Sequence, residues 1–264
     1  MERNYNTLKV NELAPYILQV TLNRPEAANA FNTEMAHEMV DLFEGLSLDM
    51  QNVRVVIITG AGERAFCAGG DLKERNGMTD SEWRAQHLVY ERMARAVIAC
   101  PIPLIGAING AAYGGGCELT AMLDFVYVAE NARFAQTEVK LGIMPGAGGT
   151  QTLARAIGER RAKEVILTGK TFDAREAYAW GLANEVYPLE ELIPAALEVA
   201  KIVAANAPIA VRQAKQAIHR GLQMALGDGL AFEIEAYNRT ILTEDRIEGV
   251  AAFNEKRAAN FKGR

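Results

Sequence analysis

The sequence has little of the residue types that most often serve as nucleophiles or metal ligands: three cysteines, three histidines and two serines among 264 residues. An odd number of widely spaced cysteines speaks against a disulfide framework and fits a reducing compartment. The histidines are too few and too scattered to suggest a metal cluster. Neither serine lies in a Gly-x-Ser-x-Gly elbow, and Cys67 has no histidine near it in the sequence, so serine and cysteine catalysis are poor candidates.

The chain also shows no secretory signal, no apolar run of membrane-spanning length and no excess of positive charge. Its first residues lack the basic and apolar regions of a signal peptide, and no hydrophobic segment approaches the length needed to cross a bilayer. A net charge of −5 provides no overall field that would attract nucleic acid or an acidic membrane. We therefore expect a soluble, cytoplasmic protein without a membrane or nucleic-acid partner.

Two common nucleotide-binding motifs are missing as well. Gly169-Lys170-Thr171 looks like the end of a phosphate-binding loop, but Glu164 stands where that loop requires its first glycine. No Gly-x-Gly-x-x-Gly fingerprint for a dinucleotide occurs. We therefore expect neither a metal nor a separate cofactor.

The first half of the sequence predicts strands that alternate with helices. Residues 16–23 alternate apolar and polar side chains, which predicts a half-buried strand. Continuous apolar, β-branched runs predict strands covered on both faces at residues 53–59, 104–109 and 125–129. Asn32 or Thr33 can cap a helix after the first strand, and residues 117–123 predict another. Alternation of this kind indicates an α/β layered domain with parallel strands.

From about residue 150 onward the sequence predicts mainly helices. Their apolar spacing gives the ranges 150–157, 160–167, 173–182, 189–205, 209–226, 229–242 and 245–256. Asp173 and Thr243 stand where they can cap two of these helices. Because no linker or low-complexity segment intervenes, we expect an α/β core continued by a helical C-terminal part.

Two glycine-rich turns, each expected after a buried strand, are the first candidates for a site. They lie within Ala65–Leu72 and Gly110–Gly116. Small residues let backbone N–H groups approach a ligand closely, so the two turns could direct two donors at one carbonyl oxygen, as in an oxyanion hole. Glycine-rich turns are also common packing devices in α/β proteins, and that alternative stays open. A third stretch, Pro145–Thr150, carries the same ambiguity.

Two carboxylates stand near these turns in the sequence. Glu118 lies in the first turn of the helix predicted after the triple glycine, and Glu138 follows the third buried strand. A pair of carboxylates beside an oxyanion hole could add or remove water by acid–base catalysis. Taken singly, Glu118 could simply stabilise a helix N-terminus and Glu138 could be a surface acid. Their separation along the chain does not show that they meet.

These segments, in this order, resemble the crotonase (enoyl-CoA hydratase/isomerase) family. The similarity runs over nearly the whole chain, from Leu22–Pro25 to Phe253–Arg257. It implies an α/β fold: a spiral of repeated ββα units over residues 1–200, which holds the coenzyme A and catalytic site. Residues 201–264 are implied to form a helical trimerisation region, with the chain assembled as a homotrimer or a dimer of trimers.

The resemblance also implies roles for individual residues. The peptide N–H groups of Ala68 and Gly115 match the donors that hold the thioester oxygen. Glu118 matches the residue that orients and deprotonates the attacking water, and Glu138 matches the one that exchanges the proton at the α-carbon. The other matches are contacts to coenzyme A, which is part of the substrate and not a cofactor: Ala28, Ala68, Gly69, Gly70, Asp71, Leu72 and Gly115, with Phe253 and Lys256 reaching a neighbouring subunit.

The presence of both glutamates favours one branch of that family. Isomerases and dehalogenases usually lack one or both, and a scaffold that only binds acyl-CoA does not need them. The implied reaction is therefore the reversible syn addition of water to a 2-enoyl-CoA thioester. Asp71–Arg75 and Thr243–Gly249 look more like the 3-methylglutaconyl-CoA hydratase branch, which remains an alternative. Residues 75–88 with Trp83, and also Tyr113 and Met144, are expected to line the acyl pocket.

A nucleic-acid-binding homologue is the alternative from a different class. RNA contact in such a member is attributed to a lysine-rich helix. The matching segment here, residues 33–50, has no lysine or arginine but has the acids Glu34, Glu38, Asp41, Glu44 and Asp49. Such a surface should repel phosphate, so RNA binding is disfavoured.

Overall fold

The computed structural model describes residues 4–264, and its larger sheet has six strands. Their order is β1 (Leu8–Ala14), β2 (Ile17–Leu22), β3 (Val55–Gly60), β5 (Leu104–Ile108), β7 (Phe125–Ala129) and β10 (Glu185–Tyr187). β1 and β2 form an antiparallel hairpin, and every later pair is parallel. The strands predicted from the sequence are confirmed as β2, β3, β5 and β7, because their β-branched side chains are buried between layers.

A second sheet has four short strands in the order β4 (Ala65–Cys67), β6 (Ala111–Tyr113), β8 (Arg133–Ala135) and β9 (Thr171–Asp173). Three times, a strand of the larger sheet is followed by a strand of the smaller one: β3 by β4, β5 by β6 and β7 by β8. These strands are only three residues long, too short for an apolar pattern to predict. Because β4, β6 and β8 pair in parallel, the turns that follow them lie at one edge of this sheet.

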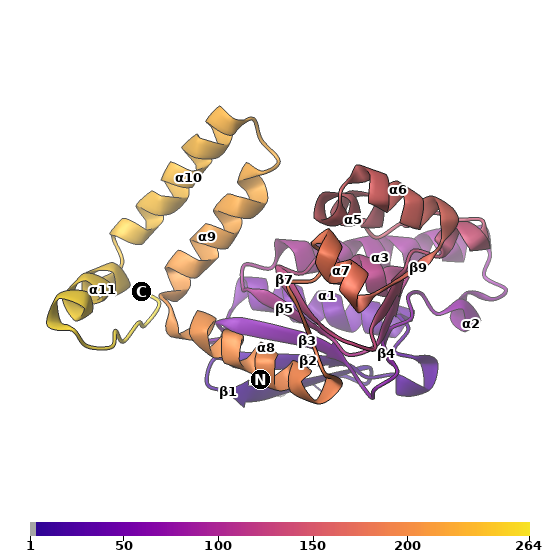
Figure 1. Cartoon of the computed structure of the whole chain (residues 1–264), viewed down its shortest axis with the longest axis horizontal. Helices are drawn as coiled ribbons and strands as arrows, with labels where there is room; N and C mark the ends of the chain where they lie inside the picture. Colours follow the sequence, from indigo (N-terminus) through magenta and orange to yellow (C-terminus); the bar gives the residue numbers. More distant parts are fainter. Residues whose placement is uncertain (1–3) are drawn as a thin grey trace.

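Helices cover both faces of the larger sheet (Figure 1). α8 (Leu189–Ala205) covers one face, where its alanines, among them Ala196 and Ala200, form a core with Ile57 and Ile105. On the other face, α1 (Thr33–Leu48) and α3 (Asp80–Ala99) pack into the main hydrophobic core. Asn32 caps α1 as predicted, since its side chain accepts the Met35 N–H.

Shorter helices connect these layers. They are η1 (Pro25–Ala27), α2 (Leu72–Arg75), α4 (Gly115–Thr120), η2 (Glu138–Leu141), α5 (Gly149–Ile157), α6 (Glu159–Thr168) and α7 (Ala174–Trp180). Asp173 caps α7 as predicted, by accepting the Glu176 N–H. α4, η2 and α5 begin at the turns that carry the candidate site residues.

The last three helices stand apart from the sheets. α9 (Pro208–Gly221) and α10 (Leu226–Ile241) form a hairpin that projects away from them, and α11 (Glu244–Glu255) follows at its end (Figure 1). The predicted helices are confirmed with shifted ends, and Thr243 caps α11 by accepting the Arg246 N–H. The predicted division after residue 200 falls inside α8, and the two-region organisation stays a prediction. No single helix in residues 4–264 is long and apolar enough to cross a membrane; only α8 and α9 together meet that test, with a bend of 107°.

Candidate active site

A cavity of about 550 Å³ opens at the edge of the small sheet where the three turns meet. Residues after β4, at the start of α4 and at the start of η2 line one side of it, and α3 lines the other. The cavity residues from the three turns are Ala68, Gly69, Gly70, Gly114, Gly115, Glu118, Thr137 and Glu138. Segments that are far apart in the sequence meet here, because parallel strands end at the same edge of their sheet.

Close backbone contact holds the first two turns together. A Cβ atom on Gly116 would lie 2.1 Å from the Cys67 carbonyl oxygen, so only glycine fits at that position. Gly69 has a φ of +93°, and a Cβ there would lie 2.8 Å from the Tyr113 carbonyl oxygen. The sequence left two roles open for these glycines, tight packing and exposure of the backbone to a ligand. The structure is consistent with both, because the glycines let the turns pack closely and place backbone atoms beside the cavity.

Glu118 lines the cavity and is buried, with 3% of its surface exposed. Its Oε1 accepts the N–H groups of Ala147 at 2.9 Å and Gly149 at 2.8 Å. Burial raises the pKa of Glu118, and the two amide donors act in the opposite direction. The third glycine-rich stretch, which the sequence left ambiguous, therefore orients this carboxylate.

Glu138 lines the same cavity from η2 and is also buried. Burial raises its pKa to about 7, and the negative charge of Glu118 adds to this shift. The amide of Gln136, turned so that its nitrogen faces the carboxylate, donates to both Glu138 oxygens at 3.1 Å. Glu138 is therefore not a surface acid, and the structure brings the two predicted glutamates into one site.

The backbone amides of the first turn differ from the prediction. The Ala68 N–H donates to the Ala28 carbonyl oxygen at 3.1 Å, so it is not a free donor although Ala68 lines the cavity. Phe31 bonds to the residues on both sides of Gly70: its N–H donates to Gly69 O, and its carbonyl oxygen accepts the Asp71 N–H. Neither bond uses the N–H of Gly70 itself. Within residues 4–264, neither the Gly70 N–H nor the Gly115 N–H has a hydrogen-bond acceptor, and both residues line the cavity.

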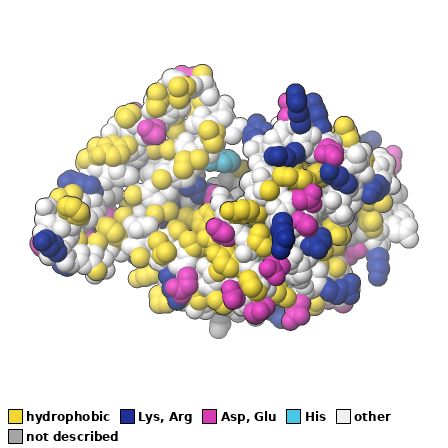
Figure 2. Space-filling model, viewed as in Figure 1, with side chains coloured by type: hydrophobic (Ala, Val, Ile, Leu, Met, Phe, Trp, Pro, Cys, Tyr) yellow, Lys and Arg dark blue, Asp and Glu magenta, His cyan; other side chains and the backbone are white. Residues whose placement is uncertain are grey.

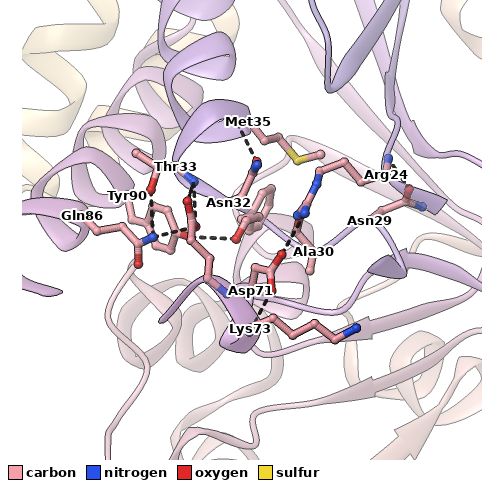
Figure 3. A network of polar contacts seen from close by, with 12 residues as sticks. Arg24, Asn29, Ala30, Asn32, Thr33, Met35, Asp71, Lys73, Gln86 and Tyr90 are labelled. Atoms are coloured by element: carbon pink, nitrogen blue, oxygen red, sulfur yellow. Dashed lines mark hydrogen bonds and ion pairs between the residues drawn. The ribbon is translucent and has the colours of Figure 1, made fainter. Parts of the chain in front are cut away.

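Not all residues of this turn that were predicted to contact coenzyme A line the cavity. Gly69, Gly70 and Leu72 line the cavity, but Asp71 does not. The Asp71 carboxylate pairs with Arg24 at 2.8 Å and accepts the Lys73 N–H at 2.9 Å (Figure 3). Burial alone would raise the pKa of Asp71, but these partners outweigh it and hold the pKa below its ordinary value. Asp71 thus fixes the turn through its side chain.

Three other predicted contacts lie outside the cavity. Ala28 has a left-handed φ of 50°, and its carbonyl accepts the Ala68 N–H, which places it behind the turn. Phe253 and Lys256 lie on α11 and at its end, at the opposite side of the molecule from α2 (Figure 1). Phe253 is 84% exposed. Within one chain these two residues do not reach the cavity, and their predicted contact with a neighbouring subunit stays a prediction.

The far wall of the cavity is largely apolar and comes from α3 and the segment after η2. Trp83, Leu88 and Met144 line it as predicted, but Tyr113 does not. His87, within the predicted stretch 75–88, also lines the cavity, whereas the sequence interpretation missed Met93, Ala94, Val97, Met122, Leu141 and Ile143. The apolar spacing of α3 was the available signal for several of them. No group of three or more His, Cys, Asp or Glu side chains in residues 4–264 is arranged to hold a metal ion.

Comparison with known proteins connects this geometry to one kind of enzyme. Residues 13–264 match the family model described as enoyl-CoA hydratase/isomerase. The chain is 43% identical to a short-chain-enoyl-CoA hydratase of Clostridium acetobutylicum, over 93% of this chain and 94% of that protein. It is 40% identical to a 2,3-dehydroadipyl-CoA hydratase of Escherichia coli, over 94% and 96%. The crystal structure of an enoyl-CoA hydratase from Bacillus anthracis superposes with a TM-score of 0.96 at 44% identity, covering 98% of this chain and 100% of that one.

Proposed function

Because the chain belongs to the enoyl-CoA hydratase/isomerase family, we propose that it adds water reversibly, with syn geometry, across the α,β double bond of a 2-enoyl-CoA thioester. The observation that carries this proposal is the pair of buried carboxylates, Glu118 and Glu138, in one cavity beside two backbone amides without acceptors. Those are the groups that hydration needs: a base for water, an acid for carbon, and donors for the charge that develops on the thioester oxygen.

The amides of Gly70 and Gly115 are the proposed oxyanion donors. Attack of water at the β-carbon moves the π electrons toward the thioester carbonyl, whose oxygen gains negative charge. Two preorganised N–H groups stabilise that charge, and one such donor is typically worth roughly 10²–10³ in rate. Gly70 takes the place predicted for Ala68, because the Ala68 N–H is already bonded to Ala28.

The two glutamates divide the proton transfers. Burial raises the pKa of Glu118, which makes its carboxylate a stronger base, and the amides of Ala147 and Gly149 hold Oε1 in place to orient water and accept its proton. Glu138 has its pKa raised to about 7, so about half of the molecules carry a proton on it at neutral pH, and this proton is delivered to the α-carbon. The C–O bond forms at Cβ as the C–H bond forms at Cα, and exchange with solvent returns both carboxyls to their starting states.

Conservative amide substitutions test this assignment. Glu118→Gln and Glu138→Gln keep the size of each side chain but remove its proton chemistry, so each should slow crotonyl-CoA hydration by about 10²–10⁴-fold. The rate is followed by the loss of the conjugated thioester absorbance, and circular dichroism checks that each variant is folded. Hydration at the wild-type rate in either variant would remove that glutamate from the mechanism.

The assembly proposed for this enzyme is a homotrimer or a dimer of trimers formed through the C-terminal helices. The α9–α11 region exposes many large apolar side chains to solvent in the single chain (Figure 2). They include Ile218, Leu222, Leu226, Leu230, Ile234, Tyr237, Leu242, Ile247, Val250 and Phe253. Exposed apolar surface of this extent is typical of an interface, and contact there could bring Phe253 and Lys256 to a neighbour's coenzyme A.

A further inference from the structure

One buried residue, Phe31, contacts both of the proposed oxyanion donors although it supplies neither. Its N–H donates to Gly69 O at 2.7 Å and its carbonyl oxygen accepts the Asp71 N–H at 2.7 Å, so its backbone holds the residues on both sides of Gly70. This pairing is a parallel β-bridge between Phe31 and Gly70. The Phe31 ring lies against Gly115, where a Cβ atom would be 3.3 Å from Phe31 Cδ2. The relative position of the two donor amides therefore depends on where Phe31 lies.

Tyr90 of α3, which lines the cavity, holds the carbonyl group of Phe31. Its hydroxyl donates to Phe31 O at 2.7 Å, so this oxygen accepts two hydrogen bonds, one from Tyr90 and one from the Asp71 N–H. The Tyr90 ring also lies near Gly70, since a Cβ atom there would be 3.6 Å from Tyr90 Cε2. Burial raises the pKa of the Tyr90 hydroxyl well above its ordinary value, so the hydroxyl keeps its proton and remains a donor. Tyr90 thus connects α3 to the turn that contains Gly70.

Arg24 links the same two segments at a second point (Figure 3). Its Nη1 donates to Ala30 O at 2.7 Å, and its Nη2 donates to the Asp71 carboxylate at 2.8 Å. One guanidinium therefore bonds both the residue before Phe31 and the residue after Gly70. The side chains of this ion pair are mostly buried, with 18% and 10% of their surface exposed. Charge-assisted hydrogen bonds in such a place are among the stronger ones in a protein, so the two segments are firmly joined.

We infer that Tyr90 and Arg24 are positioning residues of the oxyanion hole. They fix Phe31 against the first glycine-rich turn, and Phe31 in turn fixes the directions of the two donor amides. The inference rests on the proposed hydratase function and its two donors, and it adds the side chains that align them. Both side chains act through Phe31. Their effect is on the rate, because oxyanion donors stabilise the developing charge only when they are preorganised, and a small displacement loses much of that stabilisation.

Tyr90→Phe tests the inference because it removes one hydroxyl and keeps the ring. The Phe31 carbonyl then loses one of its two hydrogen bonds, and the Gly70 amide should shift relative to that of Gly115. We expect kcat for crotonyl-CoA hydration to fall on the order of 10-fold, less than the roughly 10²–10³ that the loss of a whole donor costs. KM should stay within about twofold of the wild-type value, since the interaction that is weakened is made in the transition state.

An infrared measurement separates the alignment of the donors from a general effect on structure. Butyryl-CoA is saturated, so it binds without being hydrated, and an isotopic label at its carbonyl carbon isolates that stretching band in a difference spectrum. Two aligned donors polarise the C=O bond and lower its frequency relative to free butyryl-CoA. In Tyr90→Phe the band should move back toward its value in solution. Arg24→Lys keeps the charge but not the fork that spans Ala30 O and Asp71, and it should move the band in the same direction.

Tyr178→Phe is the matched control, because it removes the hydroxyl of an exposed tyrosine of α7 outside the cavity and should change neither kcat nor the band. An unchanged kcat or band in Tyr90→Phe, or an unchanged band in Arg24→Lys, would overturn the inference for that residue. A raised KM with the wild-type kcat in Tyr90→Phe would overturn it too, and would assign Tyr90 to coenzyme A binding.

The infrared band does not depend on turnover, so the two proposals can fail separately. A wild-type enzyme that lowers the carbonyl frequency but hydrates no thioester, crotonyl-CoA included, would overturn the hydratase proposal, while the shift of the band in Tyr90→Phe would still support the positioning role. A wild-type enzyme that leaves the carbonyl frequency of bound butyryl-CoA at its solution value would overturn the oxyanion donors and this inference with them.

Discussion

At the scale of single residues, the chemistry of the site depends on which polar groups are already bonded within the chain. Matching by sequence placed an oxyanion donor at Ala68, but the Ala68 N–H is bonded to the Ala28 carbonyl oxygen, and the amide of that turn without an acceptor in residues 4–264 is that of Gly70. The direction of each N–H follows from backbone torsions such as the φ of +93° at Gly69, which a sequence does not specify. The glutamates were easier to predict, since a side chain can be matched by type without knowing the path of the backbone.

The shared protonation of Glu118 and Glu138 predicts a pH dependence of hydration. The reaction needs one proton on the pair, and Glu138 carries it with a pKa of about 7. A raised carboxyl pKa means that the required proton is present below about pH 7 and is lost as the pH rises through that value. The kcat/KM for crotonyl-CoA should therefore fall above about pH 7, measured by initial rates between about pH 5 and 9. A rate that stays constant up to the top of that range would show that the pair does not need its proton.

At the scale of elements, short segments with no sequence pattern of their own position the whole site. β4, β6 and β8 each have three residues, yet their parallel pairing aligns the turns that carry Gly70, Gly115 and Glu138. None of these strands was predicted, because three residues show no period. The longer elements were predictable: α8 has the predicted bounds Leu189–Ala205, and β7 the predicted bounds Phe125–Ala129.

Two glycine substitutions should separate the packing of these turns from their catalytic role. In Gly149→Ala the new Cβ would lie 2.8 Å from Glu118 Cγ, so it displaces the catalytic side chain. In Gly116→Ala it would lie 2.1 Å from the Cys67 carbonyl oxygen, where backbone must move. We expect the first variant to lose about 100-fold in kcat with a modest change in melting temperature. The second should lose about 3 kcal/mol or more of unfolding free energy. Equal effects of both variants on stability, with no loss of activity in Gly149→Ala, would contradict this division.

At the scale of the whole molecule, the sequence predicted the order of the layers but not how they meet. Apolar runs and helix caps are local signals, and they located the α/β core and the C-terminal helices to within a few residues. The cavity is formed by contacts among α3, α4 and η2, which are long-range. That is why Glu118 and Glu138 could be named from the family resemblance while Gln136 could not.

The exposed apolar face of the C-terminal hairpin leads to a prediction about assembly. Ile234 of α10 is 55% exposed in the single chain, and burying it against a second copy would remove that surface from water. Ile234→Asp should therefore shift the protein from trimer or hexamer toward monomer, measured by light scattering after size-exclusion chromatography. Leu167→Asp is the matched control, because Leu167 is 70% exposed on α6, on the opposite side of the molecule from α11 (Figure 1), and this variant should assemble as the wild type does. If Phe253 and Lys256 reach a neighbour's coenzyme A, the Ile234→Asp monomer should also show a raised KM for crotonyl-CoA. A wild-type monomer, or an Ile234→Asp variant that assembles normally, would place the interface elsewhere.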